Sequence, residues 1–419
     1  MALRSPLADR WSLDPDVVFL NHGSYGACPT DVLAAQRAWQ ERMEREPVRW
    51  FNEQLQPALD EARARVAAFL HAEGDDLAFL RNATTGVNVV LRSLRFQPGD
   101  RILAADHEYN ACLNAAAYVA QRDGATLDVA TLPFPIDDPD DIVERVLDAV
   151  RPRTRLAVLS ALTSPTAVVM PIERLARELS RRGVEVLVDG AHTPGQMPVD
   201  LTDLAAAGVS YWTGNAHKWL CAPKGSGILW VRHDRQPDIR PLVISHGAND
   251  PRTDRSRFRL EFDWPGTDDW SAALAIPDAI DVMAGMVGGG WREVMARNHA
   301  LAIAGRDLVC DRLGLEPATP DAMLGAMAAV LLPVPPAASS ALSPLDSDPI
   351  QAALLARHRI QVPVLPWPTL WTPGRTGSTP SGRLLRLSAQ LYNSLGAYEL
   401  LAEALAELVG ASSLGSGAA

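Results

Sequence analysis

The stretch VEVLVDGAHTPGQMPVDL, residues Val184–Leu201, decides the fold of this chain. It begins with an apolar run of strand length, residues 184–188, which places Asp189 at its end and His192 three residues later. An apolar run without polar alternation is typical of a strand that is buried on both faces, as in parallel sheets covered by helices. Ligands on such sheets bind beyond the carboxyl ends of the strands. We therefore expect the chemistry of this protein in the residues directly after each run.

Similar runs alternate with helical patterns over more than 200 residues. Strands are expected at Leu77–Arg81, Arg101–Ala105, Leu156–Ser160 and Gly227–Val231, and helices at Asp31–Arg45, Gln54–Leu70, Thr85–Leu94, Asp140–Ala149, Ile172–Arg182 and Asn298–Leu313. Such alternation predicts an α/β protein with a mainly parallel sheet that helices cover on both faces.

The composition changes after about Gly285, which predicts more than one domain in the 419 residues. We expect an N-terminal arm over residues 1–20, a large domain over 21–285, a smaller α+β domain over 286–410 and a flexible tail over 411–419. In the smaller domain we predict helices at Pro349–His358 and Leu395–Val409, a strand at Leu384–Ser388, and loops at the Pro-, Gly- and Ser-rich segments Pro333–Pro349 and Trp371–Arg383.

Charge and cysteine content exclude several classes of function. There are 39 basic and 50 acidic side chains, a formal charge of -11, which opposes general attraction to nucleic acid or to an anionic membrane. The sequence has neither a secretory signal nor an apolar run of membrane-spanning length, so we expect a cytoplasmic protein without a membrane partner. The four cysteines, Cys28, Cys112, Cys221 and Cys310, form no CxxC pair, so neither a disulfide framework nor a metal site is expected.

Asp189 allows two interpretations. In isolation it is a common turn former or helix cap. Alternatively, it is the buried anion that keeps a ring nitrogen protonated, as enzymes that use pyridoxal 5'-phosphate (PLP) require. A second block, YWTGNAHKWLCAPKGSGILWVR, favours the second interpretation because it places Lys218 in an apolar, aromatic turn after His217. Desolvation there lowers the pKa of the amine, and Schiff-base chemistry needs a neutral amine.

Five motifs in order along the chain resemble the class V aminotransferase family of fold-type I PLP-dependent enzymes, and within it the isopenicillin N epimerase-like branch. They are NHGSYGACP (Asn21–Pro29), RNATTGVN (Arg81–Asn88), DHEYNA (Asp106–Ala111), VDGAH (Val188–His192) and TGNAHKWL (Thr213–Leu220). The resemblance extends from about Val18 to Val409. It implies a fold-type I PLP-dependent transferase fold with PLP as the cofactor.

The resemblance also implies roles for single residues. Lys218 matches the lysine that binds PLP covalently, Asp189 the partner of the pyridine nitrogen, His192 a donor to the phenolic oxygen, and His107 the residue that stacks on the ring. Both histidines are equally compatible with a structural role in which backbone groups satisfy them.

The segment after Leu80 predicts a phosphate site, because a helix that begins after a strand presents free N–H groups to an anion. A plain helix cap by Thr84 or Thr85 is the alternative. The resemblance favours phosphate and implies the binding residues Thr84, Thr85, Gly86, Asn215 and His217. It also implies that Thr267, in WPGTDDW, reaches the phosphate of a partner subunit, so that a homodimer shares its active sites.

Arg386 lies between apolar neighbours in LLRLS, and a half-buried guanidinium needs an anion. The resemblance implies that this anion is the α-carboxylate of an amino-acid substrate. Asn21, His22 and Tyr109 are expected to line the same pocket.

PLP acidifies the Cα proton of an amino acid, and the protein selects among the reactions that are then open to the substrate. No cysteine occurs after Leu313, so the mobile nucleophile of a cysteine desulfurase is not expected in the small domain, and Cys221 and Cys310 are interpreted as buried hydrophobes. We predict an epimerase or racemase that acts on an amino acid or an amino-acid-containing metabolite. A carbon–sulfur lyase, of the desulfurase or sulfoxide lyase kind, and an aminotransferase are the alternatives. A PLP-binding regulator is disfavoured because no DNA-binding segment is visible.

Overall fold

A seven-stranded sheet is the centre of the large domain in the computed structural model, which describes residues 2–333, 347–368 and 382–415. Its order is β2 (Leu77–Leu80), β8 (Gly227–Val231), β7 (Tyr211–Asn215), β6 (Glu185–Gly190), β5 (Thr154–Ser160), β3 (Arg101–Ala105) and β4 (Thr126–Ala130). Strands β7 to β4 are parallel, and β8 is antiparallel to both of its neighbours. The prediction of an α/β fold with a mainly parallel sheet is confirmed.

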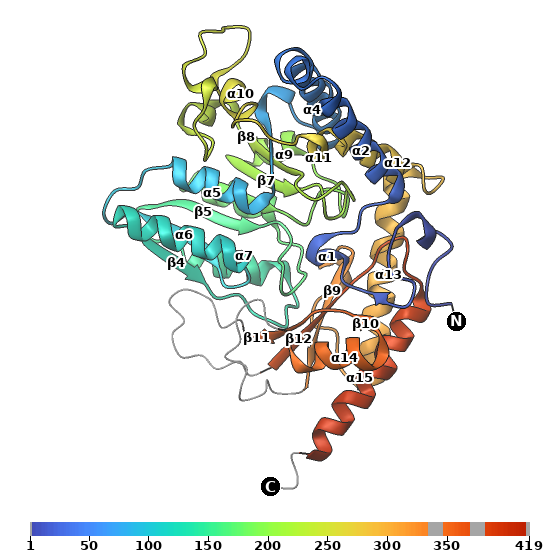
Figure 1. Cartoon of the computed structure of the whole chain (residues 1–419). Coiled ribbons are helices and arrows are strands. Elements are labelled where there is room, and N and C mark those ends of the chain that lie inside the picture. Colours follow the sequence, from blue (N-terminus) through green and yellow to red (C-terminus); the bar gives the residue numbers. More distant parts are fainter. Residues whose placement is uncertain (1, 334–346, 369–381, 416–419) are drawn as a thin grey trace.

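The strands other than the edge strand β4 are largely buried on both faces, as their apolar runs predict. In β5, Leu156 and Val158 contact one hydrophobic core, whereas Ala157 and Leu159 contact another, because successive side chains point to opposite faces. The first core is covered by α5 (Ala83–Ser93) and α6 (Asn110–Asp123), which lie side by side (Figure 1). Helices α4 (Leu55–Leu70), α7 (Pro139–Asp148), α8 (Ile172–Arg181) and α9 (Leu201–Ala207) contribute to the second.

Five of the predicted helices of the large domain are confirmed to within two residues at each end, namely α2 (Thr30–Arg45), α4, α5, α7 and α8. The remaining helices here are short or were not predicted: α1 (His22–Tyr25), α3 (Pro47–Arg49), α6, α9, α10 (Arg257–Phe262), α11 (Ser271–Leu274) and α12 (Ile276–Ala284). Within the described parts of the chain, no helix has both the length and the apolar character that crossing a bilayer requires.

The small domain is built on an antiparallel sheet in the order β11 (Val364–Trp367), β12 (Gly382–Ser388) and β9 (Met327–Leu332). Helices α13 (Gly290–Leu313), α14 (Pro349–His358) and α15 (Leu395–Gly415) pack with it, and α13 lies beside α15 (Figure 1). The predicted strand and α14 are confirmed. The loops expected at Pro333–Pro349 and Trp371–Arg383 lie largely outside the described residues.

Two helix boundaries in the small domain differ from expectation. Helix α13 begins at Gly290 rather than Asn298, and the Glu293 side chain accepts a hydrogen bond from the Gly289 N–H, 2.6 Å away, at this start. Helix α15 continues to Gly415, so the tail expected from residue 411 is wrong for its first residues. Once a helix is nucleated, each further residue adds a hydrogen bond at little cost, so the helix extends into the small and polar residues that follow Val409.

The N-terminal arm belongs structurally to the small domain. Strand β1 (Val18–Phe19) pairs in parallel with β10 (Ile360–Gln361), and Val18 and Leu20 are part of the small domain's hydrophobic core. The arm, expected as a separate unit, thus completes a core whose other residues come from the last third of the chain.

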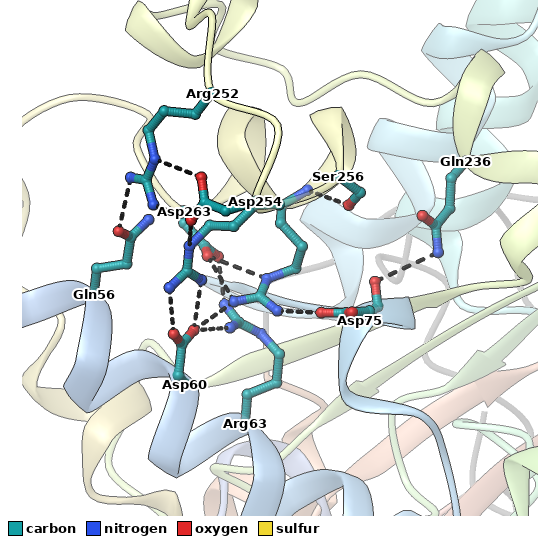
Figure 2. Close-up of polar contacts among 11 residues, drawn as sticks. Gln56, Asp60, Arg63, Asp75, Gln236, Arg252, Asp254, Ser256 and Asp263 are labelled. Carbon is teal, nitrogen blue, oxygen red and sulfur yellow. Dashed lines mark hydrogen bonds and ion pairs between the residues drawn. The ribbon is translucent and has the colours of Figure 1, made fainter.

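An ion-pair network connects α4 to the segment around α10 (Figure 2). Arg63, 1% exposed, donates to Asp60, 3.0 Å away, and to Asp263. Arg259 donates to the same two carboxylates, and Arg255 to Asp60 at 2.5 and 2.9 Å. Each buried charge therefore has an opposite charge, which is the condition for tolerating it in the interior.

Asp263→Asn is expected to lower the free energy of unfolding by about 3 kcal/mol, because breaking a buried pair leaves Arg63 and Arg259 without a full counter-charge. Urea unfolding followed by tryptophan fluorescence measures the change. Asp254→Asn is the matched control, since Asp254 pairs with Arg252 at the surface. Its effect should stay within about 0.5 kcal/mol, and equal effects of the two substitutions would contradict a stabilising role for the buried network.

Candidate active site

A cavity of about 200 Å³ opens at the carboxyl ends of the central parallel strands. It is lined by Ser24, Tyr25, Asn82, Ala83, Thr84, Tyr109, Ser160, Leu162, Ser164, Asp189, Ala191, His192, Asn215, His217 and Lys218. These residues lie at or after the ends of β2, β3, β5, β6 and β7, with Ser24 and Tyr25 added from α1. The polar and ionisable side chains of the cavity thus lie beyond the carboxyl ends of the strands, where the sequence predicts a ligand site.

Asp189 lies near the end of β6 with its carboxylate buried beside the cavity. Its Oδ1 accepts a hydrogen bond from the Ala191 N–H, 2.9 Å away, and its Oδ2 accepts one from the Cys112 thiol, 3.0 Å away. A carboxylate accepts more than two hydrogen bonds, so Asp189 retains lone pairs for a protonated ligand atom in the cavity.

The Lys218 amine lies 3.0 Å from His192 Nε2. Burial lowers the pKa of Lys218 to about 7, with the charge of Arg386 acting in the same direction and Asp189 opposing it. Burial also holds the pKa of His192 well below its usual value. Because Trp219 Nε1 donates to His192 Nδ1 at 3.5 Å, the neutral imidazole carries its hydrogen on Nε2. His192 is therefore a donor toward the cavity.

The turn that carries Lys218 is fixed from behind by His22. His22 Nε2 lies 2.9 Å from the Lys218 carbonyl oxygen, and Nδ1 lies 2.9 Å from the Tyr392 hydroxyl. Burial lowers the pKa of His22 to about 3, so the ring is neutral and donates to the carbonyl. His22 is not part of the cavity wall, which corrects its expected place in the substrate pocket.

Gly26 also packs closely against the turn that carries Lys218. A side chain at Gly26, whose φ is 70°, would come within 2.0 Å of the His217 carbonyl oxygen.

The first turn of α5 presents a free backbone donor to the cavity. The Ala83 N–H donates to Asn215 Oδ1 and the Thr85 N–H to Asn82 Oδ1, both at 2.8 Å. This leaves the N–H of Thr84, which lines the cavity, for an anion. His217 adds a buried ring nitrogen, Nδ1, that has no partner in the described part of the chain.

Thr85 and Gly86 do not line this cavity, although both were expected to bind the cofactor. The Thr85 hydroxyl donates to Asn82 Oδ1 at 3.0 Å, so this residue contributes to the helix cap. Gly86 lets α5 approach β7, because a Cβ at this position would lie 2.1 Å from Thr213 Oγ1. Both contacts fix the position of the helix, and a role of either residue in cofactor binding stays a prediction.

Arg386, on β12, is 4% exposed and reaches toward the cavity from the small domain. It donates to the Ser164 carbonyl oxygen at 2.6 Å and to the Ser24 hydroxyl at 2.9 Å, and both serines line the cavity. Its Nε has no partner among the described residues. Burial lowers the pKa of Arg386 to about 10, so it keeps its charge at neutral pH without a carboxylate partner.

The expected stacking residue His107 lies outside the cavity wall. It is fully buried, with its Nδ1 3.0 Å from Thr166 Oγ1 and its ring 4.9 Å from that of Trp367, edge to face. Tyr109, two residues later and 48% exposed, lines the cavity instead. The turn after β3 therefore directs Tyr109 inward, and sequence order alone did not show which of the two rings faces the ligand.

Two further expected residues lie away from the cavity wall. Asn21 accepts a hydrogen bond from the Ser24 hydroxyl at 2.5 Å, and so acts on the cavity through that serine. Thr267 is exposed and does not contact the cavity of its own chain. A role for Thr267 at the site of a second subunit stays a prediction.

Sequence reasoning missed Ser24, Tyr25, Ser160, Ser164 and Cys112. The sequence contained a signal for three of them, because Ser24 and Tyr25 are within the motif NHGSYGACP and Ser160 is the last residue of a predicted strand. Cys112 lies on α6, which was not predicted, and nothing in the sequence places its thiol beside Asp189. Among the described residues, no cluster of His, Cys, Asp and Glu is arranged to hold a metal ion.

The groups at this cavity fit PLP. Asp189 is an anion for the pyridine nitrogen, Lys218 a neutral amine for the aldehyde, and His192 a donor for the phenolic oxygen. The Thr84 N–H provides a donor for the phosphate, and the His217 ring lies at the same wall of the cavity. Each part of the cofactor finds a group of matching chemistry.

Comparison with known proteins agrees with this chemistry. The profile of the family described as aminotransferase class-V matches residues 25–304. The chain is 38% identical to an isopenicillin N epimerase of Amycolatopsis lactamdurans, over 95% of this chain and 96% of that protein. It is 30% identical to a probable L-cysteine desulfhydrase, chloroplastic, of Arabidopsis thaliana, over 94% and 84%.

The fold is also that of solved structures. A cysteine desulfurase of Thermococcus onnurineus NA1 superposes with a TM-score of 0.77 at 20% identity, over 98% of this chain and 99% of that one. The fold and the cavity together define a PLP-binding protein of fold type I. The chain belongs to the class V aminotransferase family, and it is a PLP-dependent enzyme.

Lys218→Ala is expected to abolish covalent attachment of PLP, because it removes the amine beside His192. Borohydride reduction followed by intact-protein mass measures the attachment. In the wild type, attachment should become faster as the pH rises and level off above about 7, where Lys218 is deprotonated. Lys224→Ala is the control, since Lys224 donates to the Gly26 carbonyl oxygen and should leave attachment unchanged. An adduct that persists in Lys218→Ala would disprove the assignment.

Proposed function

We propose that this enzyme is an epimerase that inverts the α-carbon of an amino acid or of a metabolite with a free amino-acid group. PLP, when bound at Lys218, acidifies the Cα–H bond of such a substrate. The observation that carries the proposal is the pairing of Lys218, an amine of pKa about 7 in the cavity wall, with the charged Arg386, which donates to Ser164 and Ser24 of the same wall. The similarity to isopenicillin N epimerase over nearly the whole chain supports it.

Arg386 is the residue that we assign to substrate binding. Among the described residues its guanidinium donates to neutral oxygens alone, from Ser164 and Ser24, so the α-carboxylate is the counter-charge that we assign to it. A two-pronged contact to the carboxylate fixes the orientation of the substrate. The Cα–H bond is thereby held within reach of Lys218.

Inversion needs proton donors on both sides of Cα. Lys218 comes after β7 and Tyr109 after β3, and these strands lie on opposite sides of β6 and β5. The amine and the phenol thus enter the cavity from opposite sides. We assign Lys218 to removal of the Cα proton, which its amine keeps, and Tyr109 to donation of its own phenolic proton to the other side of Cα. Exchange with solvent then restores both groups. Burial raises the pKa of Tyr109, which keeps the phenol protonated and able to donate.

A carbon–sulfur lyase is the second candidate, because the chain is also similar to proteins named L-cysteine desulfhydrase. No cysteine is part of the cavity wall among the described residues, so the site offers no thiol to accept sulfur. A lyase that releases sulfide directly needs no such thiol. Transamination is a third outcome, since it uses the same cofactor residues.

The test is incubation of the holoenzyme with single enantiomers in D2O, using isopenicillin N and a panel of amino acids that includes L-cysteine. We expect deuterium at Cα together with the opposite enantiomer, as seen by mass spectrometry and chiral chromatography. Arg386→Lys should raise KM about tenfold, because it loses the two-pronged contact, and amines without a carboxylate should react poorly. Release of sulfide from L-cysteine, without inversion of any amino acid, would contradict the epimerase assignment and support the lyase assignment.

We also propose that the enzyme is a homodimer with shared active sites. Thr267 is exposed in its own chain, in a segment held by the ion pair of Arg81 and Asp268. The apolar side chains of Leu242 and Val243 are exposed around the same groove as Asp268, and the next residue, Ile244, is also exposed. A second copy of the chain would cover these side chains and place Thr267 at the other phosphate site.

Mixing two variants tests this assembly. Thr267→Glu should repel the phosphate of the partner subunit, and Lys218→Ala lacks the amine, so each variant alone should have little activity. Hybrid dimers contain one intact site, so refolding the two together should restore up to about a quarter of the wild-type activity by random pairing. Light scattering reports the assembly. A fully active monomer, or no recovery from a mixture that is dimeric, would contradict the shared site.

A further inference from the structure

We propose that Cys112 is a positioning residue, whose thiol fixes the orientation of the Asp189 carboxylate. The proposal rests on the role assigned above to Asp189 and adds the group that holds it. The observation is the contact between Cys112 Sγ and Asp189 Oδ2 at 3.0 Å. This distance is short for a bond that involves sulfur, and both side chains are buried.

The two oxygens of Asp189 are held from two directions. The backbone beyond β6 holds Oδ1 through the Ala191 N–H, and the first turn of α6 holds Oδ2 through Cys112. Tyr109, the N-cap residue of α6, lies three positions before Cys112, so one helix start both lines the cavity and reaches the carboxylate. Two donors on opposite oxygens define the plane of the carboxylate.

The chemistry of sulfur suits this role. Burial, together with the charge of Asp189, holds the pKa of Cys112 well above its usual value, so the thiol stays protonated and remains a donor. A thiol is a weak donor. It therefore orients the carboxylate while leaving most of the negative charge for the pyridine nitrogen, whereas a hydroxyl would form a stronger charge-assisted bond.

The other ionisable groups around this contact stay the same when Cys112 is replaced. Lys218 and Arg386 lie toward the cavity, and Asp106 and Glu108 lie in the turn before α6. Burial raises the pKa of Glu108 to about 8, so it is largely neutral at pH 7, and it accepts hydrogen bonds from Ser160. A change at the ring nitrogen in a Cys112 variant would therefore report on the Asp189 carboxylate.

The alternative is that Cys112 only fills space in the core between α6 and the sheet. The two interpretations differ in a spectroscopic property. A space-filling residue affects stability when it is replaced but leaves the protonation of the pyridine nitrogen unchanged. A positioning residue changes that protonation.

The experiment uses holoenzyme reconstituted with PLP labelled with 15N in the ring, and monitors the nitrogen signal against pH. We expect Cys112→Ala to move the midpoint of ring protonation to lower pH and to reduce kcat by about tenfold, because the carboxylate loses the partner that orients it, as the loss of an outer hydrogen-bond partner does at metal sites. Cys112→Ser should also move the midpoint to lower pH, because its hydroxyl donates a stronger bond to the carboxylate and leaves less negative charge for the ring nitrogen. KM should change little, because Arg386 holds the substrate. Cys310→Ala is the control, since Cys310 is buried in the small domain and should leave the signal unchanged.

Asp189→Asn separates the failure of this proposal from the failure of its premise. It should lose the protonated ring signal altogether. If it does, and both Cys112 variants keep the wild-type midpoint, Cys112 has no positioning role. If Asp189→Asn keeps the signal, the assignment of Asp189 itself is wrong. Cys112→Ser preserves volume most closely, so it decides the question if Cys112→Ala does not fold.

Discussion

The parallel register of β5, β6 and β7 is the constraint on which the site depends. It places Ser160, Asp189 and Thr213 side by side near the carboxyl ends of these strands. The segments that follow the three strands therefore begin next to one another. A carboxylate and a lysine turn that are distant in sequence are thereby brought to one cavity. The close approach of α5 at Gly86 then positions the phosphate end against the same strands. A shift of one residue in this register would turn Asp189 to the other face.

Charge in the cavity explains why its two basic groups behave differently. Asp189 opposes the loss of charge from Lys218, but burial and the repulsion from Arg386 disfavour two positive charges there. The amine gives up its proton because its pKa starts far below that of a guanidinium. This difference supports the proposed roles of Arg386 as the anion-binding group and of Lys218 as the nucleophile and proton acceptor. The repulsion between the two basic groups thus favours a neutral amine at Lys218 and a charged guanidinium at Arg386.

The sequence predicted the elements whose pattern is local and periodic. Strands such as Leu156–Ser160 and helices such as Pro349–His358 were clear because apolar spacing or turn residues define them. Helix α6 was missed, and with it Cys112. The stacking role of His107 stays a prediction, because its ring packs against Trp367 outside the cavity wall, and the sequence does not show which of two nearby rings a turn directs inward. Asp189 and Lys218 were found because strand ends and an apolar turn mark them.

The pairing of the N-terminal arm with β10 has a consequence for how the chain folds during synthesis. Val18 and Leu20 lie in a core that also contains Leu387 and Leu405, so its contacts span nearly the whole sequence. Such contacts are slow to form because the loops between them must close first. The strands of the large domain leave the ribosome earlier and have their partners nearby. The apolar residues of the arm therefore stay exposed until the last helix has been synthesised. Exposed apolar surface favours aggregation, so we expect a chaperone to act on the nascent chain during this interval.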